Sequence, residues 1–377
     1  MQIKQKQSNR LKQYDSYVVG YCGMQNSGDD ALMYSTLWGA KHMLNHKRIS
    51  LGLYGVPDKG LLVSHQFPLH QQQAFPGYNR LTHYRAALQS SNVIFGGGSV
   101  LHSESDINLK RHMLKLAYNR NSRAVGVSLG PFANVAAEKA CAQFLNECPF
   151  VGLRDKESLA IAQAIAPQAN AKLTFDLAPT LLYSTQVPVP KARRGIALAL
   201  CPVAVNAFGE VNIHAERERI TQIARLIETL YHQTGEPITL LTFNGHCQLG
   251  DGQINHAIFN KLCGKLPLVV KPYDNNPLAV LKDLGQYQAI ISMRLHGSIL
   301  GYLAQTPVIS INYHSKCTGW CEQIGLADKY QYSADEFSIS AISQRINDGL
   351  KQGFTAPQLT VEDALSQTLL NWSTDYE

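Results

Sequence analysis

The sequence predicts an α/β protein made of two doubly wound domains. Short apolar runs typical of buried strands alternate with segments whose apolar residues recur at helical spacing. The alternation stops once, at the proline-rich and charged segment 184–195, and then starts again. With 377 residues, the chain is long enough for two domains with separate cores. We therefore expect two Rossmann-like domains that face each other across a cleft, with the ligand edges of both sheets lining it.

The boundaries follow from the same alternation. The polar, basic segment 1–14 is predicted to be a flexible tail. It also lacks the apolar stretch of a signal peptide. The N-terminal, acceptor-side domain is expected over 15–187 and the C-terminal domain over 192–335. The last segment, 336–377, is predicted to form helices that pack back on the first domain.

Composition excludes several classes of protein. A hydrophobic content of 45% with 16% charged residues indicates a globular chain, and no apolar run approaches the ~20 residues of a membrane span. The eight cysteines are scattered without zinc-ligand spacing and no carboxylate or His cluster is evident, so we expect reduced thiols, a cytoplasmic location and no metal. The net charge of +6 suits anionic substrates or peripheral contact with the inner face of a membrane, whereas no basic run indicates nucleic acid.

The first strand–loop–helix unit carries two acidic residues. A strand at 17–21 precedes a helix that is expected from about Asp29, with Asp30 in the same first turn, where negative charge is favoured. The G-x-G-x-x-G fingerprint of dinucleotide-binding turns is absent. The loop could instead offer backbone N–H groups and the Asp29 carboxylate to a hydroxylated substrate. The alternative is simple capping of the helix by Ser27 or Asp29. We favour such a structural role for Asp30 and leave both interpretations open for Asp29.

The first domain continues with a strand at 48–55 and the segment 56–80, which is predicted to be a long mobile loop or an acceptor-side lid. A later strand runs into Gly96, Gly97, Gly98 and Ser99, where three glycines indicate close backbone approach or positive φ. A ligand phosphate or sugar is the favoured cause, and tight packing against a neighbouring loop is the alternative. The remaining predicted strands and helices are 123–130, 134–147, 150–155, 156–165 and 171–176.

The second domain ends in the most informative stretch, 289–316. Its predicted elements before that stretch are 195–200, 215–232, 238–243, 253–263, 267–273 and 277–284. In the stretch itself, Arg294, Leu295 and His296 follow one strand, and His314 and Lys316 follow the next. Ligands of parallel sheets bind at the carboxyl ends of strands, and helix N-termini attract anions. The stretch therefore predicts a site for a small, multiply charged anion, although each residue alone has an ordinary structural interpretation.

Five short motifs carry a resemblance to a known family. They are N-S-G-D-D, G-G-G-S, R-D-x-x-S at 154–158, D-L-A-P at 176–179, and S-M-R-L-H-G with Y-H-S-K downstream. In this order, over residues 17–325, the chain resembles the polysaccharide pyruvyl transferase family. The resemblance implies a GT-B-like fold and a transferase that moves the pyruvyl group of phosphoenolpyruvate onto sugar hydroxyls, giving a ketal and phosphate. It implies phosphoenolpyruvate as the donor substrate and no cofactor.

The resemblance also implies residue roles. Arg294 and His296 would bind phosphoenolpyruvate, with Arg154 and Lys316 as further contacts. As a hypothesis, His296 is general acid or phosphate donor, Asp29 is general base, and Arg294 with Lys316 neutralises the departing phosphate. The other predicted substrate contacts are Asn26, Gly28, Gly97, Gly98, Ser99, Leu295 and His314. The implied acceptor is a glycan such as a lipid-linked oligosaccharide, and 56–80 and 201–214 are expected to shape its pocket.

Two other functions stay open. A GT-B glycosyltransferase would bind a nucleotide sugar in the same cleft, but a Glu or aromatic residue suited to a nucleoside is replaced here by Arg294 and His296. A non-catalytic anion- or glycan-binding protein would not need to keep these two residues together with Lys316.

Overall fold

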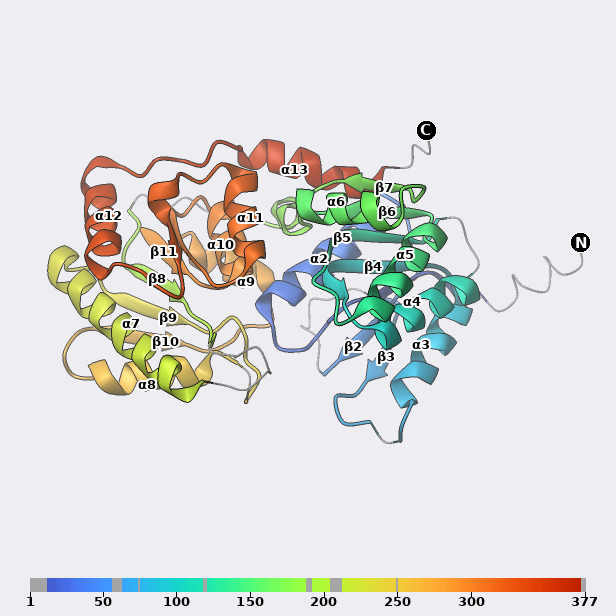
Figure 1. The fold of residues 1–377 in the computed structure, drawn as a ribbon, viewed down its shortest axis with the longest axis horizontal. Coiled ribbons are helices and arrows are strands. Elements are labelled where there is room, and N and C mark those ends of the chain that lie inside the picture. The colour runs from blue at the N-terminus through green and yellow to red at the C-terminus, as the bar shows by residue number, and fades with distance from the viewer. Residues whose placement is uncertain are drawn as a thin grey trace, which may run out of the picture. The chain divides into compact units, whose positions relative to one another are not determined.

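The computed structural model describes residues 12–55, 63–73, 75–117, 121–187, 192–203, 212–248 and 250–373. The predictions for the tail up to residue 11, for 56–62 and for 204–211 lie outside these residues. The chain divides into two compact units (Figure 1). The N-terminal unit consists of Met1–Met24, Asp29–Leu181 and Glu362–Glu377, and the C-terminal unit of Gln25–Gly28 and Leu182–Val361.

The N-terminal unit contains a parallel seven-stranded sheet in the order β3-β2-β1-β4-β5-β6-β7. Its strands β5 and β6 are buried along their whole length, and β4 is buried except at Ser91 and Ser99, as expected for parallel strands covered on both faces. The strands are β1 Tyr14–Val19, β2 Ile49–Tyr54, β3 His65–Leu69, β4 Ser90–Leu101, β5 Arg123–Leu129, β6 Phe150–Leu153 and β7 Ala171–Leu173. The helices between them are α2 Ser27–His42, α3 Tyr78–Gln89, α4 Glu104–Ala117, α5 Val135–Glu147, α6 Lys156–Ile165 and the 3-10 turn η1 Ala178–Tyr183.

The prediction of a long loop over 56–80 is wrong where the structure describes this segment. Residues 65–69 form β3, which pairs in parallel with β2, and α3 begins at Tyr78. Phe67 is buried while Pro68 beside it is exposed. Proline is tolerated here because β3 is an edge strand, where a missing backbone N–H removes no ladder bond. The proline and the polar residues around it hid this strand from sequence reasoning.

The C-terminal unit repeats the strand order of the first, as β10-β9-β8-β11-β12-β13, and all its strands are parallel. Two sheets of this doubly wound order confirm the predicted fold class. The strands are β8 Ile196–Ala199, β9 Ile238–Leu241, β10 Leu268–Lys271, β11 Ala289–Ser292, β12 Val308–Asn312 and β13 Gln331–Ser333. The helices are α7 Ile213–Thr234, α8 Gly252–Leu262, α9 Pro277–Leu284, α10 Leu295–Leu303, α11 Ser315–Ile324, η2 Asp328–Tyr330 and α12 Ile339–Gln352.

The last helices do not all behave as predicted. The expectation that 336–377 packs back on the first domain is wrong for α12, whose buried Ile342 and Ile346 belong to a helix that packs on α7 in the C-terminal unit. The segment from Glu362 onward, with α13 Val361–Leu369 and η3 Leu370–Trp372, belongs to the N-terminal unit. Trp372 is buried there over Gly39 of α2, where a larger residue than glycine would collide with the indole ring.

Within the described residues, none of the helices has both the length and the hydrophobicity needed to cross a bilayer.

Candidate active site

The order of strands marks a ligand edge in each unit. In a doubly wound sheet the strand order reverses between two central strands, and ligands bind in the crevice beyond their carboxyl ends. These strands are β8 and β11 in the C-terminal unit, and β1 and β4 in the N-terminal unit. In the C-terminal unit Arg294 lies two residues beyond the end of β11, which places this residue at the reversal point.

Arg294 is held by a buried carboxylate. Its Nε lies 3.1 Å from Oδ1 of Asp251, and its Nη2 bonds to the same oxygen. The other oxygen of Asp251 accepts the backbone N–H groups of Phe243 and Asn244, both at 2.9 Å. The Asp251 side chain is fully buried, whereas that of Arg294 is 19% exposed. Within the described residues neither bond uses Nη1, so this edge of the guanidinium is the one that could face an anion.

The charge of Arg294 is secured by this pairing. Burial alone lowers the pKa of the guanidinium, but the negative charge of Asp251 and its hydrogen bond outweigh burial and raise the pKa above its usual value. Because the Asp251 carboxylate is fully buried and bonds two guanidinium nitrogens, it fixes the orientation of the cation near the end of β11.

Two helices begin at the same edge of the C-terminal sheet. Because β11 and β12 pair in parallel, α10 and α11 start side by side at their carboxyl ends. His314 caps α11, since its Nδ1 accepts the backbone N–H of Lys316 at 3.2 Å. Lys316 is half-buried in the first turn, next to this cap. The positive ends of two helix dipoles thus add to the charges of Arg294 and Lys316.

His296 lies in the first turn of α10, against a segment from early in the chain. Residues 25–28 belong to the C-terminal unit, and the backbone N–H of Ser27 donates to the carbonyl of Phe243 at 2.8 Å. A Cβ atom added to Gly28 would lie 2.4 Å from Nδ1 of His296. Glycine at position 28 therefore makes room for the imidazole ring, whereas we had predicted this glycine as a substrate contact. Its contact with substrate stays a prediction.

Asn26 also has a local structural role. Its side-chain oxygen accepts the backbone N–H of Gly28 at 3.0 Å, at the start of α2, and it forms an isolated antiparallel bridge with Asn244. Leu295 is half-buried as the first residue of α10. The predicted substrate contacts of both residues stay untested.

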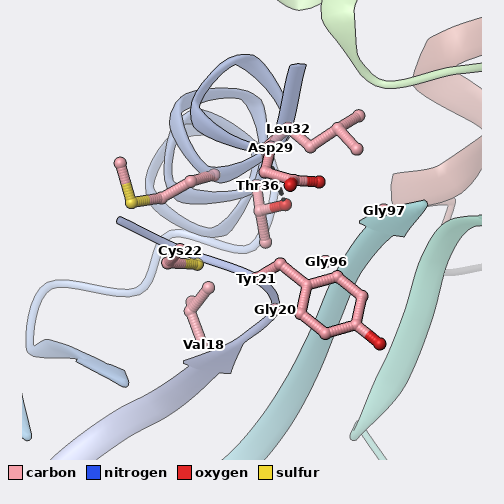
Figure 2. A pocket seen from close by; sticks show the side chains of 10 residues that line it. Val18, Gly20, Tyr21, Cys22, Asp29, Leu32, Thr36, Gly96 and Gly97 are labelled. Carbon is pink, nitrogen blue, oxygen red and sulfur yellow. Dashed lines mark hydrogen bonds between the residues drawn. The ribbon is translucent and has the colours of Figure 1, made fainter. Parts of the chain in front are cut away.

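The N-terminal unit has a pocket at its own reversal point (Figure 2). Asp29 in the first turn of α2 lies on one side, and Gly96 and Gly97 of β4 lie on the other, with Tyr21 from the loop after β1 between them. Burial, with the charges of Asp106 and Asp29, raises the pKa of Tyr21 to about 12. The phenol therefore stays neutral into the alkaline range and can act as a hydrogen-bond donor.

The glycine run is explained largely by packing. A Cβ on Gly96 would lie 2.3 Å from Oγ1 of Thr36, and one on Gly97 would lie 2.8 Å from Leu32. Gly97 and Gly98 also have φ angles of 45° and 82°, which favour glycine. The packing alternative is thus the one that the structure supports, with the correction that the partner is helix α2 and not a loop. Contacts of Gly97, Gly98 and half-buried Ser99 with substrate stay a prediction.

Arg154 is placed differently from the expectation. Its Nη1 bonds to Asp176 at 2.9 Å and its Nε to Ser128 at 2.5 Å, and the residue is only 6% exposed. Asp155 caps α6 by accepting the backbone N–H of Ser158. The R-D-x-x-S and D-L-A-P motifs therefore form a buried network inside the N-terminal unit. This is the structural ion pair that a strand-end arginine commonly makes.

Asp251 is the residue that sequence reasoning missed. It directly precedes Gly252 and the predicted helix at 253–263, which suggests at most a helix cap. Its partner Arg294 is 43 residues further along the chain, so no local pattern connects the two. In the described parts of the chain, no three His, Cys, Asp or Glu side chains gather as a metal ion would require.

The chain therefore combines two parallel α/β sheets with a cationic group at the ligand edge of the C-terminal sheet. A sequence model of the family "Polysaccharide pyruvyl transferase" matches residues 26–315. The chain belongs to this family, which confirms the resemblance that its motifs suggested. None of the curated proteins compared with the chain matches it.

Several solved structures share the fold at very low sequence identity. UDP-GlcNAc 2-epimerase from Methanocaldococcus jannaschii has a TM-score of 0.61 and 9% identity, covering 94% of this chain and 98% of its own. Anabaena Alr3699/HepE in complex with UDP and glucose has a TM-score of 0.56 and 11% identity, covering 95% of both chains. The lipopolysaccharide outer core galactosyltransferase WaaB has a TM-score of 0.51 and 10% identity, covering 95% and 96%. The fold is therefore that of GT-B epimerases and glycosyltransferases.

Proposed function

We propose that the protein transfers the pyruvyl group of phosphoenolpyruvate to two hydroxyls of a glycan, forming a cyclic ketal and releasing phosphate. Membership of the pyruvyl transferase family supports the group that is transferred. The choice of phosphoenolpyruvate as the donor rests on Arg294. Asp251 holds this residue near the end of β11, and the two bonds to Asp251 leave one edge of the guanidinium unused.

The residue types suit this donor. Phosphoenolpyruvate carries a carboxylate and a phosphate on the same carbon atom, so it needs several cationic contacts within a small volume. Arg294 supplies a planar fork, Lys316 a point charge, and the N-termini of α10 and α11 supply backbone N–H groups. The donor brings the transferred group itself, and therefore no further cofactor is part of the proposal.

The reaction requires balanced proton movements. Protonation of the methylene carbon of phosphoenolpyruvate makes the adjacent carbon electrophilic, and the first sugar hydroxyl adds there and loses its proton. The carbon–oxygen bond to phosphate then breaks, and the second hydroxyl closes the ketal and loses its proton. One proton ends on the new methyl group and the other on the departing phosphate. The enzyme must therefore deliver protons at one place, remove them at another, and stabilise the leaving phosphate.

We assign these tasks as hypotheses. His296, in the first turn of α10, delivers a proton to the methylene carbon or to the phosphate, and Arg294 with Lys316 stabilises the phosphate as it leaves. Asp251 positions Arg294 without touching substrate. Asp29, which lines the pocket of the N-terminal unit, is the proposed base for the sugar hydroxyls. Arg154 is left out, because its guanidinium bonds to Asp176 and Ser128.

Glycosyl transfer from a nucleotide sugar is the alternative. The Alr3699/HepE structure contains UDP and glucose, and it shares the fold of this chain at 11% identity. A likeness at this level concerns the fold alone. The cationic cluster at the end of β11 is compact and favours the smaller anion. A lipid-linked oligosaccharide acceptor, and with it work at the inner face of a membrane, belong to the proposal as well.

The test is phosphate release from phosphoenolpyruvate with a panel of β-galactoside and N-acetylmannosamine acceptors. Acceptor-dependent release is expected for the wild type, with a loss of about 10³-fold in Arg294→Ala. Arg294→Lys keeps a positive charge beside the buried carboxylate of Asp251 but lacks the planar guanidinium fork. If phosphate release falls in this variant too, the loss reflects binding geometry and not a folding defect. Arg225→Ala, which changes an exposed arginine of α7 in the same unit, is the matched control and should behave like wild type.

Two outcomes would change the assignment. Near-normal turnover of His296→Ala would remove the acid role from this residue. Absence of release with every acceptor, together with a thermal shift caused by a nucleotide sugar but not by phosphoenolpyruvate, would favour glycosyl transfer.

A further inference from the structure

Helix α3 exposes apolar side chains in the middle of the face that points to solvent. Leu81 is 56% exposed and Leu88 is 44% exposed, although His83, Ala86 and Ala87 fill the opposite, buried face. Leu81 and Leu88 are seven residues apart, which is two helical turns, so they lie above one another on the same side. An ordinary surface helix carries polar residues at such positions.

Basic residues flank this apolar line. At 100° per residue, Arg80 and Arg85 fall on either side of Leu81 and Leu88, and both arginines are exposed. Phe75, in the loop that leads into α3, is 48% exposed. We call these five residues the α3 face. They combine apolar side chains with flanking cations, and α3 itself lies at the periphery of the N-terminal unit (Figure 1).

The surroundings of the α3 face carry little negative charge. The chain has no Asp or Glu between Asp58 and Glu104. On the strands and the helix that pack against α3, the acidic residues are Asp15, Glu104 and Asp106. Asp15 is paired with Arg48 at 3.1 Å and Asp106 with Lys110 at 2.5 Å, so two of the three charges are compensated. An approaching anionic surface would therefore meet an excess of positive charge.

The face is held in place at both ends of the helix. The side chain of Asn79 bonds to the backbone N–H and carbonyl of His70 at 3.0 and 2.8 Å, and the Phe75 ring packs edge-on against Tyr78. At the other end, the ammonium group of Lys12 donates to carbonyls where α3 finishes, among them that of Ser90 at 2.7 Å. Little conformational freedom is then lost when the face binds a partner.

We propose that the α3 face docks the protein on a bilayer that contains anionic lipids. Phe75, Leu81 and Leu88 would enter the headgroup region, and Arg80 and Arg85 would contact lipid phosphates, as on helices that lie in a membrane interface. A second copy of this chain is the weaker occupant, because it would bring two positively charged faces together. The docking role deepens the proposed work at the inner face of a membrane and rests on it, but its test does not depend on the transfer reaction.

The test is flotation of the full-length protein with vesicles of phosphatidylglycerol and phosphatidylcholine in equal parts, beside vesicles of phosphatidylcholine alone. The wild type should float with the anionic vesicles, and added salt should weaken this binding. Leu81→Ser/Leu88→Ser and Arg80→Gln/Arg85→Gln should each bind at least about tenfold more weakly. Val135→Ser changes a residue that is 67% exposed elsewhere in the same unit, and should bind like wild type.

Several results would overturn the proposal. They are no binding to either vesicle, equal binding to both, or unchanged binding of both double variants whose thermal melting matches wild type. Self-association of the wild type that the leucine variant abolishes, without vesicle binding, would assign the face to contact between two copies. The arginine variant leaves the apolar residues in place, so a folding defect of the leucine variant cannot mask the outcome.

Discussion

Arg154 and Arg294 each follow a strand of a parallel sheet, β6 in the N-terminal unit and β11 in the C-terminal unit, but their surroundings differ. Each follows a strand at the carboxyl edge of a parallel sheet, and each is paired with a buried aspartate, Asp176 or Asp251. Arg154 divides its bonds between Asp176 and Ser128, and its side chain is 8% exposed. Arg294 directs two nitrogens at one oxygen of Asp251, and its side chain is 19% exposed.

This comparison shows that the position of an arginine in a motif does not decide its role. Arg154 bonds to Ser128 at the end of β5 and to Asp176, so these hydrogen bonds stabilise the N-terminal unit. The arginine of the C-terminal unit is fixed along one edge and open along the other. The side chain of Arg294 is also the more exposed of the two, at 19% against 8%, which is why we propose substrate binding for Arg294 and a structural role for Arg154.

The largest expected effect is on stability, in Arg154→Met. Removing the guanidinium leaves the buried carboxylate of Asp176 without its cation, which should cost about 3 to 5 kcal/mol of unfolding free energy. Denaturant unfolding measures the loss. Arg154→Met/Asp176→Leu, which removes both charges, should recover much of it. A single variant as stable as wild type, but unable to bind phosphoenolpyruvate, would break the comparison and return Arg154 to the donor site.

The next effect is a pH dependence of the N-terminal unit. Burial, with the nearby charge of Lys110, lowers the pKa of His83 from 6.5 to about 4, and its Nδ1 bonds the Tyr17 hydroxyl at 2.9 Å. Because the folded pKa lies below the unfolded one, the stabilisation is complete above pH 6.5 and is lost as the pH falls towards 4. The loss should reach about 3 kcal/mol. His83→Gln should flatten unfolding free energy over this range, and an unchanged acid dependence would contradict the assignment.

Glycine positions give a third effect. Gly97→Ala should cost about 2 kcal/mol more than Gly235→Ala, because both glycines have positive φ but only the first would collide with a neighbour, Leu32. Thermal melting compares the two variants. Equal destabilisation, combined with a selective loss of acceptor binding in Gly97→Ala, would favour a ligand role for the glycine run.

The smallest effect is expected for Asp251→Asn. The amide oxygen can still accept the two backbone N–H groups, but the amide nitrogen that replaces Oδ1 cannot accept from Arg294, so the pairing that orients Arg294 is lost. The KM for phosphoenolpyruvate should rise about tenfold, with a smaller change in kcat, since binding geometry is affected more than chemistry. Asp283→Asn, which disturbs an ion pair with Lys271 in the same unit, is the control. Equal effects of both variants on KM would show that Asp251 acts only through stability.

Much of the fold was predictable because the spacing of apolar residues along the chain distinguishes strands from helices. The helices α5, α6 and α9 start and end within a residue of their predicted bounds, since each has an apolar stripe bounded by capping residues. The strand β3 was missed, because five residues with a proline carry too little pattern. The sheet order, which the two units share except for the additional edge strand β7, required the coordinates.

The sequence by itself determined the two-sheet α/β class, the family, and the concentration of Arg294, His296 and Lys316 after adjacent strands. These features depend on period and on short spacing, which are local along the chain. The tertiary structure alone decided that Arg154 is consumed by Asp176, that Asp251 holds Arg294, and that α2 presses on the glycines of β4. These are contacts between residues far apart in the chain, and the free energy of such a contact depends on the burial and geometry that folding creates.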